Sequence, residues 1–444
     1  MDAIVFIPGI LGSRLALNGE EVWPPTPVEA WSGYHRIPQL MDPGVIATGI
    51  IDNVLCFQFY RPIDDDLSAI AASTGGVKID FFYDWRKDIK LSTAPRLAEQ
   101  LEETVANGAQ SVTLVAHSMG GLIARLLLES GDWAQKPWFG KITRFVGICD
   151  PHHGAPQALA EALGLAGTSG ISPDDMPTLT SDPRYPAAYQ NLPAPNYNRL
   201  RKQPGNIALN IYKSSVAKVF SLSLSNLAAA KNSFAALDLS KRPATVEYAL
   251  IAGSQQSTLE QINVVGSTLS FVKDTAGDGT VPLWSAAPGA MGAFVTPGDH
   301  VGILKTGPFR THLFEILTGN KVMAQRFDVR PVVTISMDKV VYAPGEPMSV
   351  LIVPDSPSHE IKGTLQFAKA TDAAGRLFAQ HGAEHPVQYL GAPVQNLPPM
   401  QIQAPTEPGA YRLSFEGNHT STEVTSAVFV VSQAGGVQTR QRGK

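Results

Sequence analysis

Short apolar runs alternate with helical spacings of apolar residues along the first three quarters of the chain. Runs typical of buried strands lie at residues 3–7, 78–83, 111–116, 142–149 and 246–252. Apolar positions three and four apart, each series closed by a nearby glycine, predict helices at residues 93–106, 119–130 and 309–318. Strands separated by helices are typical of a mostly parallel sheet that is covered on both faces.

The pattern is less regular between residues 155 and 245, where Pro, Asn and Ser are frequent. An insertion of this length between sheet strands predicts a cap or lid rather than part of the scaffold.

After residue 330 the hydrophobic period changes to two. Strand patterns lie at residues 332–336, 348–353, 363–369, 387–390, 401–403, 410–415 and 427–431, with turn residues between them. About seven short strands in roughly 100 residues predict an immunoglobulin-like sandwich. We therefore expect a first domain over residues 1–325, a sandwich over 331–432 and a disordered polar tail over 433–444.

Composition narrows the function classes. Charged residues make up only 17% of the chain and the net charge is −4, which disfavours binding to nucleic acid. No apolar stretch reaches the roughly 18 residues of a membrane span, and the first residues do not resemble a signal peptide, so we expect a cytoplasmic protein. Two cysteines, Cys56 and Cys149, argue against a disulfide scaffold or a cysteine-rich zinc site.

The strongest chemical signal lies where the apolar run at 111–116 meets the helix at 119–130. The segment 116–121 reads Ala-His-Ser-Met-Gly-Gly, with Ser118 between the small residues Ala116 and Gly120. A strand that turns sharply into a helix through such a serine is typical of a nucleophile elbow. The alternative interpretation is an ordinary N-cap serine. We expect the neighbouring His117 to point away from the turn.

A serine hydroxyl needs a base, and the base needs an acid to orient it. His300 lies in a loop after a strand pattern at 293–296, late in the first domain, and is the predicted base. Asp278, between two glycines, is the predicted acid, with Asp274 and Asp299 as weaker rivals. The alternatives are a surface-loop histidine and an aspartate that only shapes its turn.

Two backbone N–H groups are needed for an oxyanion hole. Met119 follows the nucleophile, and Ile10 lies in the Gly-containing turn after the first strand, so their N–H groups are the predicted donors. The alternative for Ile10 is a plain tight turn. Trp85 is a candidate substrate contact, although the segment Asp84-Trp-Arg86 is also typical of a buried ion pair that braces the site.

Four ordered segments carry a family resemblance: Val-Phe-Ile-Pro-Gly-Ile-Leu-Gly-Ser-Arg-Leu at 5–15, Phe-Tyr-Asp-Trp-Arg at 82–86, Ala-His-Ser-Met-Gly-Gly at 116–121 and Gly-Asp-Gly-Thr-Val-Pro at 277–282. They resemble the lecithin:cholesterol acyltransferase family, which includes lysosomal phospholipase and phospholipid:diacylglycerol acyltransferases. The resemblance implies an α/β-hydrolase fold with a cap, and acyl-enzyme chemistry on lipid esters. It assigns Ser118, Asp278 and His300 to the triad and Ile10 and Met119 to the oxyanion hole.

The sequence departs from the family in lacking the paired lid cysteines of its secreted animal members, in lacking an evident membrane anchor, and in adding the sandwich. We therefore expect a serine enzyme on lipid acyl esters, acting as O-acyltransferase, as phospholipase or lipase, or as both. The alternatives are an esterase or thioesterase for a soluble substrate and a non-catalytic binding protein. No metal is expected, because the adjacent side chains of His152 and His153 tend to diverge and no ligand cluster accompanies them. No cofactor is expected, because the sequence has no Gly-rich phosphate loop or dinucleotide fingerprint. A transient membrane-surface contact and a protein partner for the sandwich are further expectations.

Overall fold

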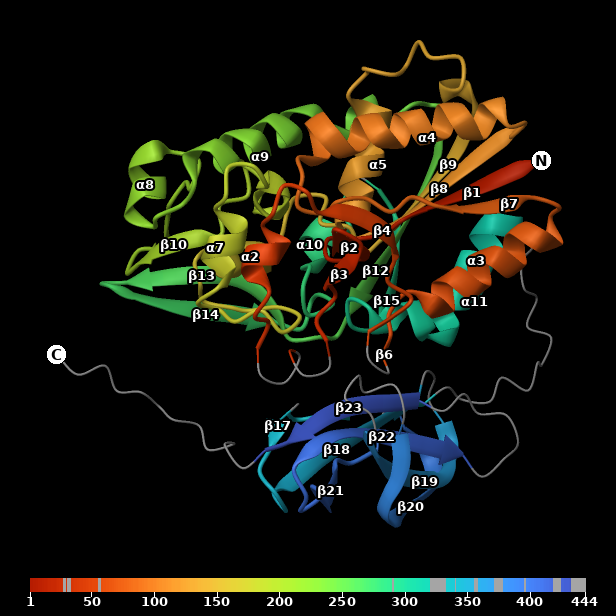
Figure 1. Cartoon of the computed structure of the whole chain (residues 1–444), viewed down its shortest axis with the longest axis vertical. Coiled ribbons are helices and arrows are strands. Elements are labelled where there is room, and N and C mark those ends of the chain that lie inside the picture. Colours follow the sequence, from red (N-terminus) through yellow and green to blue (C-terminus); the bar gives the residue numbers. More distant parts are fainter. Residues whose placement is uncertain are drawn as a thin grey trace.

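A six-stranded sheet forms the centre of the first part of the chain (Figure 1). The computed structural model describes residues 1–26, 29, 33–54, 57–289, 291–319, 333–339, 341–354, 358–370, 378–394, 397–417 and 425–432. The sheet has the order β15 (Ala293–Pro297), β12 (Glu247–Ser254), β9 (Ile142–Ile148), β8 (Ser111–His117), β1 (Asp2–Ile7) and β7 (Val77–Asp80). All five pairings between neighbours are parallel, as the sequence predicts.

Helices cover both faces of this sheet. Strand β1 shows the arrangement, because Val5 packs into one hydrophobic core and Phe6 into another. The core on the Val5 side contains Leu97 of α4 (Ala94–Ala106) and Leu122 of α5 (Met119–Glu129). The core on the Phe6 side contains Leu67 of α3 (Arg61–Ser73) and Phe309 of α11 (Gly307–Thr318). Alternate residues of a strand face opposite sides, so near-continuous apolar runs are what such a sheet requires.

Smaller elements complete this layer. They are β2 (Ser13–Leu17), β3 (Glu20–Trp23) and β4 (Ile46–Ile50) in one sheet, β5 (Asn53–Val54) with β6 (Phe57–Gln58) in another, and the helices α2 (Ile37–Leu40) and α10 (Leu283–Ala286). A short π-helix lies at Ile89–Thr93, and short 3₁₀ helices lie at Phe139–Lys141, Pro186–Asn191, Leu239–Lys241 and Gly302–Lys305.

A cap with its own core lies beside the central sheet (Figure 1). Its helices are α6 (Pro156–Ala162), α7 (Met176–Thr180), α8 (Ser214–Val219) and α9 (Leu224–Ala236). Its sheet has the order β11 (Ile207–Ala208), β10 (Leu200–Gln203), β13 (Thr258–Val265) and β14 (Thr268–Asp274). Strands β13 and β14 follow central strand β12, so this sheet draws on residues beyond the predicted insertion 155–245. The residues at which the cap begins and ends stay a prediction.

The C-terminal part is built from two β-sheets. One has the order β16 (Val333–Met337), β18 (Pro347–Pro354) and β21 (Met400–Gln403). The other has the order β17 (Val341–Tyr342), β23 (Thr425–Val431), β22 (Gly409–Gly417), β19 (Ser358–Ala370) and β20 (Phe378–Val394). Ile352 from the first sheet and Phe429 from the second share one buried cluster. The predicted fold class, an α/β-hydrolase followed by an all-β sandwich, is thus confirmed.

The boundaries 1–325 and 331–432 stay a prediction, and the tail at 433–444 lies outside the described residues. Within the described part of the chain, no helix is both long enough and apolar enough to cross a membrane.

Candidate active site

Ser118 occupies a sharp turn between β8 and α5. Its φ of 56° and ψ of −127° lie outside the regions that L-residues favour, so the surrounding packing must hold it there. Its N–H donates to Ile148 O at 2.9 Å. A Cβ on Gly120 would come within 2.4 Å of Ile7 O, so the start of α5 approaches β1 more closely than a larger residue permits. The turn therefore fixes the hydroxyl at the carboxyl edge of the sheet.

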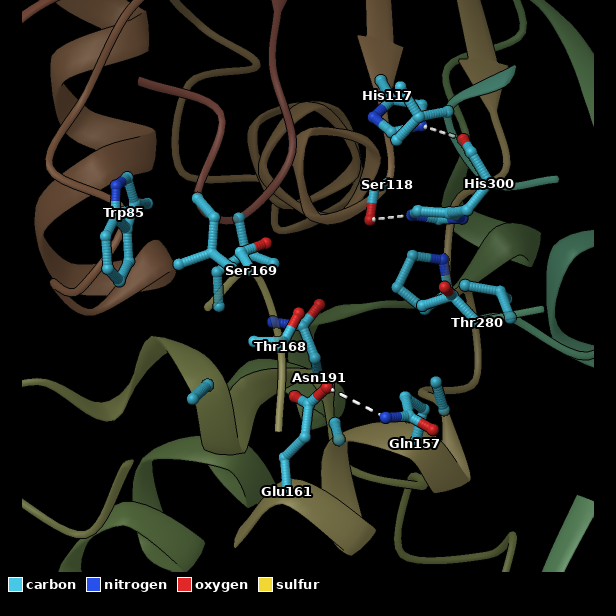
Figure 2. Close-up of a pocket in the computed structure, with 18 of the residues that line it drawn as sticks. Trp85, His117, Ser118, Gln157, Glu161, Thr168, Ser169, Asn191, Thr280 and His300 are labelled. Atoms are coloured by element: carbon cyan, nitrogen blue, oxygen red, sulfur yellow. Dashed lines mark hydrogen bonds between the residues drawn. The ribbon is translucent and has the colours of Figure 1, made fainter. Parts of the chain in front are cut away.

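The structure brings Ser118, His300 and Asp278 into one hydrogen-bonded series. Ser118 Oγ lies 2.9 Å from His300 Nε2 (Figure 2). On the other side of the ring, His300 Nδ1 lies 2.7 Å from Asp278 Oδ2. His300 comes from the loop after β15, and Asp278 comes from the loop after β14. Asp278 also forms an isolated parallel β-bridge with Gln256, which follows the end of β12. Three segments far apart in sequence therefore meet at the carboxyl ends of parallel strands, where open α/β sheets place their ligands.

The hydrogen bonds assign the protons of this series. Asp278 Oδ1 accepts from the N–H groups of Thr280 at 2.9 Å and Val281 at 2.7 Å, which leaves Oδ2 to accept from His300 Nδ1–H. The unprotonated Nε2 then faces the hydroxyl of Ser118. Burial acts to raise the pKa of Asp278, but His300 and these N–H groups outweigh it and lower that pKa. Burial acts to lower the pKa of His300, but Asp278 outweighs it and raises that pKa above 6.5.

Asp274 and His312 lie outside the cavity next to Ser118, whereas Asp299 lines it beside His300. Asp274 is exposed at the end of β14, and its carboxyl accepts from Thr275 N. Asp299 is also exposed and accepts from the N–H groups of its own loop. His312 lies on α11 and stacks on Phe294 with ring centroids 4.0 Å apart. None of the three contributes a hydrogen bond to the series of Ser118, His300 and Asp278.

Both predicted oxyanion donors lie beside Ser118. Met119 is the first residue of α5, and the first N–H groups of a helix have no partner within it. Ile10 lines the cavity next to Ser118, and a Cβ on neighbouring Gly9 would come within 2.8 Å of Ser118 Cβ. The loop after β1 therefore packs directly on the nucleophile. Donation by these two N–H groups to an oxyanion stays a prediction.

Sequence reasoning missed a second buried network around His117. Tyr60 OH lies 2.9 Å from Gly9 N and 2.8 Å from His117 Nδ1. His117 Nε2 lies 2.8 Å from His300 O (Figure 2). The carbonyl can only accept, so His117 Nε2 carries the proton and Tyr60 donates to Nδ1. Burial lowers the pKa of His117 to about 3, which keeps it neutral. His117 points away from Ser118 yet connects the Gly9 turn with the His300 loop.

A cavity of about 420 Å³ opens onto Ser118 and His300. Its apolar lining residues include Ile10, Leu11, Phe59, Met176 and Leu179. Trp85 also lines it, at the side opposite His300 in Figure 2, but its ring is held by a hydrogen bond to Ser13 O at 3.2 Å and by an edge contact with Trp23. The buried pair of Asp84 and Arg86, joined at 2.7 Å, lies beside it. The buried ion pair is therefore present, and the role of Trp85 as a substrate contact stays a prediction.

His152, His153 and Cys149 are the residues to consider as metal ligands. His152 Nδ1 lies 3.3 Å from the cationic Arg125, whereas His153 stacks on Tyr197 with centroids 4.2 Å apart, so the two rings do diverge. Cys149 comes together with Asp278 and His300, with one potential ligand atom of each within 4.8 Å of the others. Burial, followed by the charge of Asp278, raises the pKa of the Cys149 thiol well above 9.0. A metal would need the thiolate, which this surrounding disfavours.

A parallel sheet, an elbow serine at its carboxyl edge, and a histidine and an aspartate in series define the α/β-hydrolase class. Within that class, residues 76–171 match the family model described as "Lecithin:cholesterol acyltransferase". This match includes the elbow and confirms the resemblance that the motifs predict. It supports an enzyme that acts on lipid esters. No curated protein matches the chain in sequence.

Solved structures with a similar arrangement include lipases and phospholipases. The lipase BlEst2 of Bacillus licheniformis, in its mature form, aligns with a TM-score of 0.35 and 16% identity, over 71% of this chain and 91% of the lipase. Phospholipase PlaB from Legionella pneumophila aligns with a TM-score of 0.35 and 9% identity, over 98% of this chain and 91% of the phospholipase.

Proposed function

We propose that this protein transfers acyl groups from lipid esters through an acyl-enzyme on Ser118, with water or an alcohol as the acceptor. The observation that carries the proposal is the series of hydrogen bonds from Ser118 through His300 to Asp278, open to a cavity with apolar walls. The family match over residues 76–171 supports lipid esters as the substrate class.

The geometry suits acyl transfer in two halves. In the first, Ser118 Oγ attacks the ester carbonyl while His300 Nε2 takes its proton, and Asp278 stabilises the resulting imidazolium. The N–H groups of Ile10 and Met119 would stabilise the oxyanion, and His300 returns the proton to the leaving alcohol. In the second half, water or an acceptor alcohol gives its proton to His300 and attacks the acyl carbon. The bond between the acyl carbon and Ser118 Oγ then breaks, and His300 returns the proton to Oγ, which restores the hydroxyl and the neutral base.

The shape of the cavity supports a substrate with a hydrocarbon portion. Its volume of about 420 Å³ is within the range of small-molecule sites, which span about 300–1,000 Å³. Apolar side chains such as Leu11, Phe59 and Leu179 would remove an acyl chain from water, which favours binding in proportion to the apolar area buried. The balance between transfer and hydrolysis, a transient membrane-surface contact, a protein partner for the sandwich and a cytoplasmic location stay predictions.

Labelling with a fluorophosphonate, followed by a lipid screen, tests the proposal. The probe should attach to the peptide that contains Ser118, and the wild-type protein should change the acyl composition of a mixed lipid extract by mass spectrometry. Ser118→Ala should abolish both signals. Ser130→Ala is the matched control, because Ser130 ends the same helix and its Oγ only accepts from Asp132 N. Turnover that survives in Ser118→Ala would exclude this serine as the nucleophile.

A further inference from the structure

The cap supplies a polar wall to the cavity that the acyl chemistry does not use. Gln157 and Glu161 lie one turn apart on α6, and Gln157 Nε2 donates to Glu161 Oε1 at 3.1 Å. Both residues line the cavity, and in Figure 2 the carboxyl group of Glu161 points into it, across from Ser118 and His300. Asn191, the last residue of the 3₁₀ helix Pro186–Asn191, lines the same cavity.

The hydrogen bonds of these three residues leave oxygen acceptors available. One N–H of the Gln157 amide donates to Glu161 Oε1, and the carbonyl oxygen of Gln157 remains as an acceptor. Asn191 Nδ2 donates to Ala187 O at 2.9 Å and lies 3.0 Å from Met119 Sδ, which leaves the Asn191 oxygen as another acceptor. With the second carboxyl oxygen of Glu161, this wall offers oxygen acceptors to a ligand. A ligand with several N–H donors fits it best.

The charges around the cavity also favour a ligand that donates N–H groups and carries a positive charge. Among the described residues, no lysine, arginine or histidine forms an ion pair with Glu161. Arg86 also lines the cavity, but its guanidinium is engaged by Asp84 and by the carbonyl oxygens of Leu40, Asp42 and Val45. Burial raises the pKa of Glu161 to about 7, against the opposing effect of Gln157. A cation at this position would stabilise the ionised carboxyl group, whereas an anion would meet no free positive partner there.

We infer that Glu161, Gln157 and Asn191 form a subsite for a primary ammonium group on the substrate. This inference rests on the proposed function, because it assigns the polar end of the same acyl-ester pocket. A primary ammonium carries three N–H donors on a compact positive charge. A hydroxyl carries one donor and no charge, and a quaternary ammonium carries charge but no donor. The subsite therefore ranks primary ammonium first among these three groups.

Titration calorimetry on the full chain tests this ranking with three probes of equal chain length: hexylammonium, hexyltrimethylammonium and 1-hexanol. Hexylammonium should bind about tenfold more tightly than either of the others, as expected for hydrogen bonds to a charged group. Glu161→Gln keeps the shape of the side chain and removes its charge, and it should weaken hexylammonium about tenfold relative to 1-hexanol. Glu99→Gln, on the exposed face of α4, is the matched control and should change none of the three affinities.

Gln157→Leu is the second variant, in case Glu161→Gln does not fold. It removes one acceptor and should weaken hexylammonium about threefold relative to 1-hexanol. Equal affinities for the three probes in the wild-type protein, or the same preference for hexylammonium in Glu161→Gln, would overturn the subsite. Because calorimetry needs no turnover, the same titration of Ser118→Ala separates the two proposals. If Ser118→Ala does not rank the three probes in this order, only the subsite is contradicted. If Ser118→Ala still turns over ester, only the proposed function is contradicted.

Discussion

The α/β-hydrolase part and the C-terminal sandwich differ in what they bury. Both surround apolar cores, but the carboxyl edge of the parallel sheet also buries Ser118, His117 and Asp278, which are 5%, 2% and 1% exposed. Among the described residues after 332, Ser432 is the one buried polar side chain. Burial of polar groups lowers stability unless each finds a partner. Ser118, His117 and Asp278 each have a hydrogen-bond partner in His300.

The hydrogen bonds around Ser118 join distant parts of the sequence. His300 and Ser118 are 182 residues apart, and His300 and Asp278 are 22 apart. The arrangement around Ser118 therefore depends on several loops being positioned at once. We expect single changes in those loops to affect turnover strongly, and changes in the sandwich to affect it little.

Replacement of the predicted base should have the largest effect. His300→Ala should lower kcat by about 10⁴-fold or more, because removal of a triad member leaves only binding and the oxyanion hole. His312→Ala, in α11, should alter kcat less than about twofold. Steady-state kinetics on a soluble short-chain ester measures both. If His312→Ala lowered kcat more than His300→Ala does, the loop that contains His300 would not belong to the active site.

The acid should rank next. Asp278→Asn removes the charge that stabilises the imidazolium and should lower kcat by about 10³–10⁴-fold. Asp274→Asn, at the exposed end of β14, should leave kcat within about twofold of wild type. The same assay compares the two variants. A more damaging Asp274→Asn would mean that the acid is misassigned.

Acid should inhibit turnover through His300. The base must start neutral, and the pKa of His300 is raised above 6.5 by Asp278. Activity should therefore fall about tenfold per pH unit below that pKa, along a single limb whose midpoint lies above 6.5. A kcat/KM profile from pH 5 to 9 shows the limb. No acidic limb in this range would contradict the assignment of the base.

The Tyr60 network should have a moderate effect. Tyr60→Phe leaves Gly9 N–H and His117 Nδ1 without their partner and should lower kcat about tenfold with little change in KM. Tyr212→Phe removes a cap hydroxyl bonded to Pro193 O at 3.0 Å and is the control. A change in KM alone would assign Tyr60 to substrate binding instead of positioning.

The smallest effect on turnover should come from the sandwich. Phe429→Ala removes a ring from the centre of its core and should destabilise the sandwich by about 3–5 kcal/mol. The kcat/KM on a soluble ester should stay within about twofold, because no described sandwich residue lines the cavity. Calorimetric unfolding and ester kinetics on the same sample check both statements. A tenfold loss of activity in a folded variant would show that the sandwich supports the site.

Much of the fold follows from local pattern, whereas the surroundings of the site do not. The apolar runs predict the central strands because a sheet buried on both faces needs near-continuous apolar residues. The elbow around Ser118 is visible because a sharp turn demands small neighbours at fixed offsets. Tyr60 and Asn191 carry no such signal. Tyr60 meets His117 from 57 residues away, so only the folded chain reveals the contact. The pairing of β13 with β10 is equally non-local.

The acyl-enzyme itself is the most direct test of the central claim. The full-length protein is mixed with a p-nitrophenyl ester, stopped with acid within one turnover, and examined by intact mass and peptide mass spectrometry. We predict a mass increase of one acyl group, located on the peptide that contains Ser118 and absent from Ser118→Ala. An acyl group on any other residue, or rapid ester turnover with no adduct at any stopping time, would contradict the proposal.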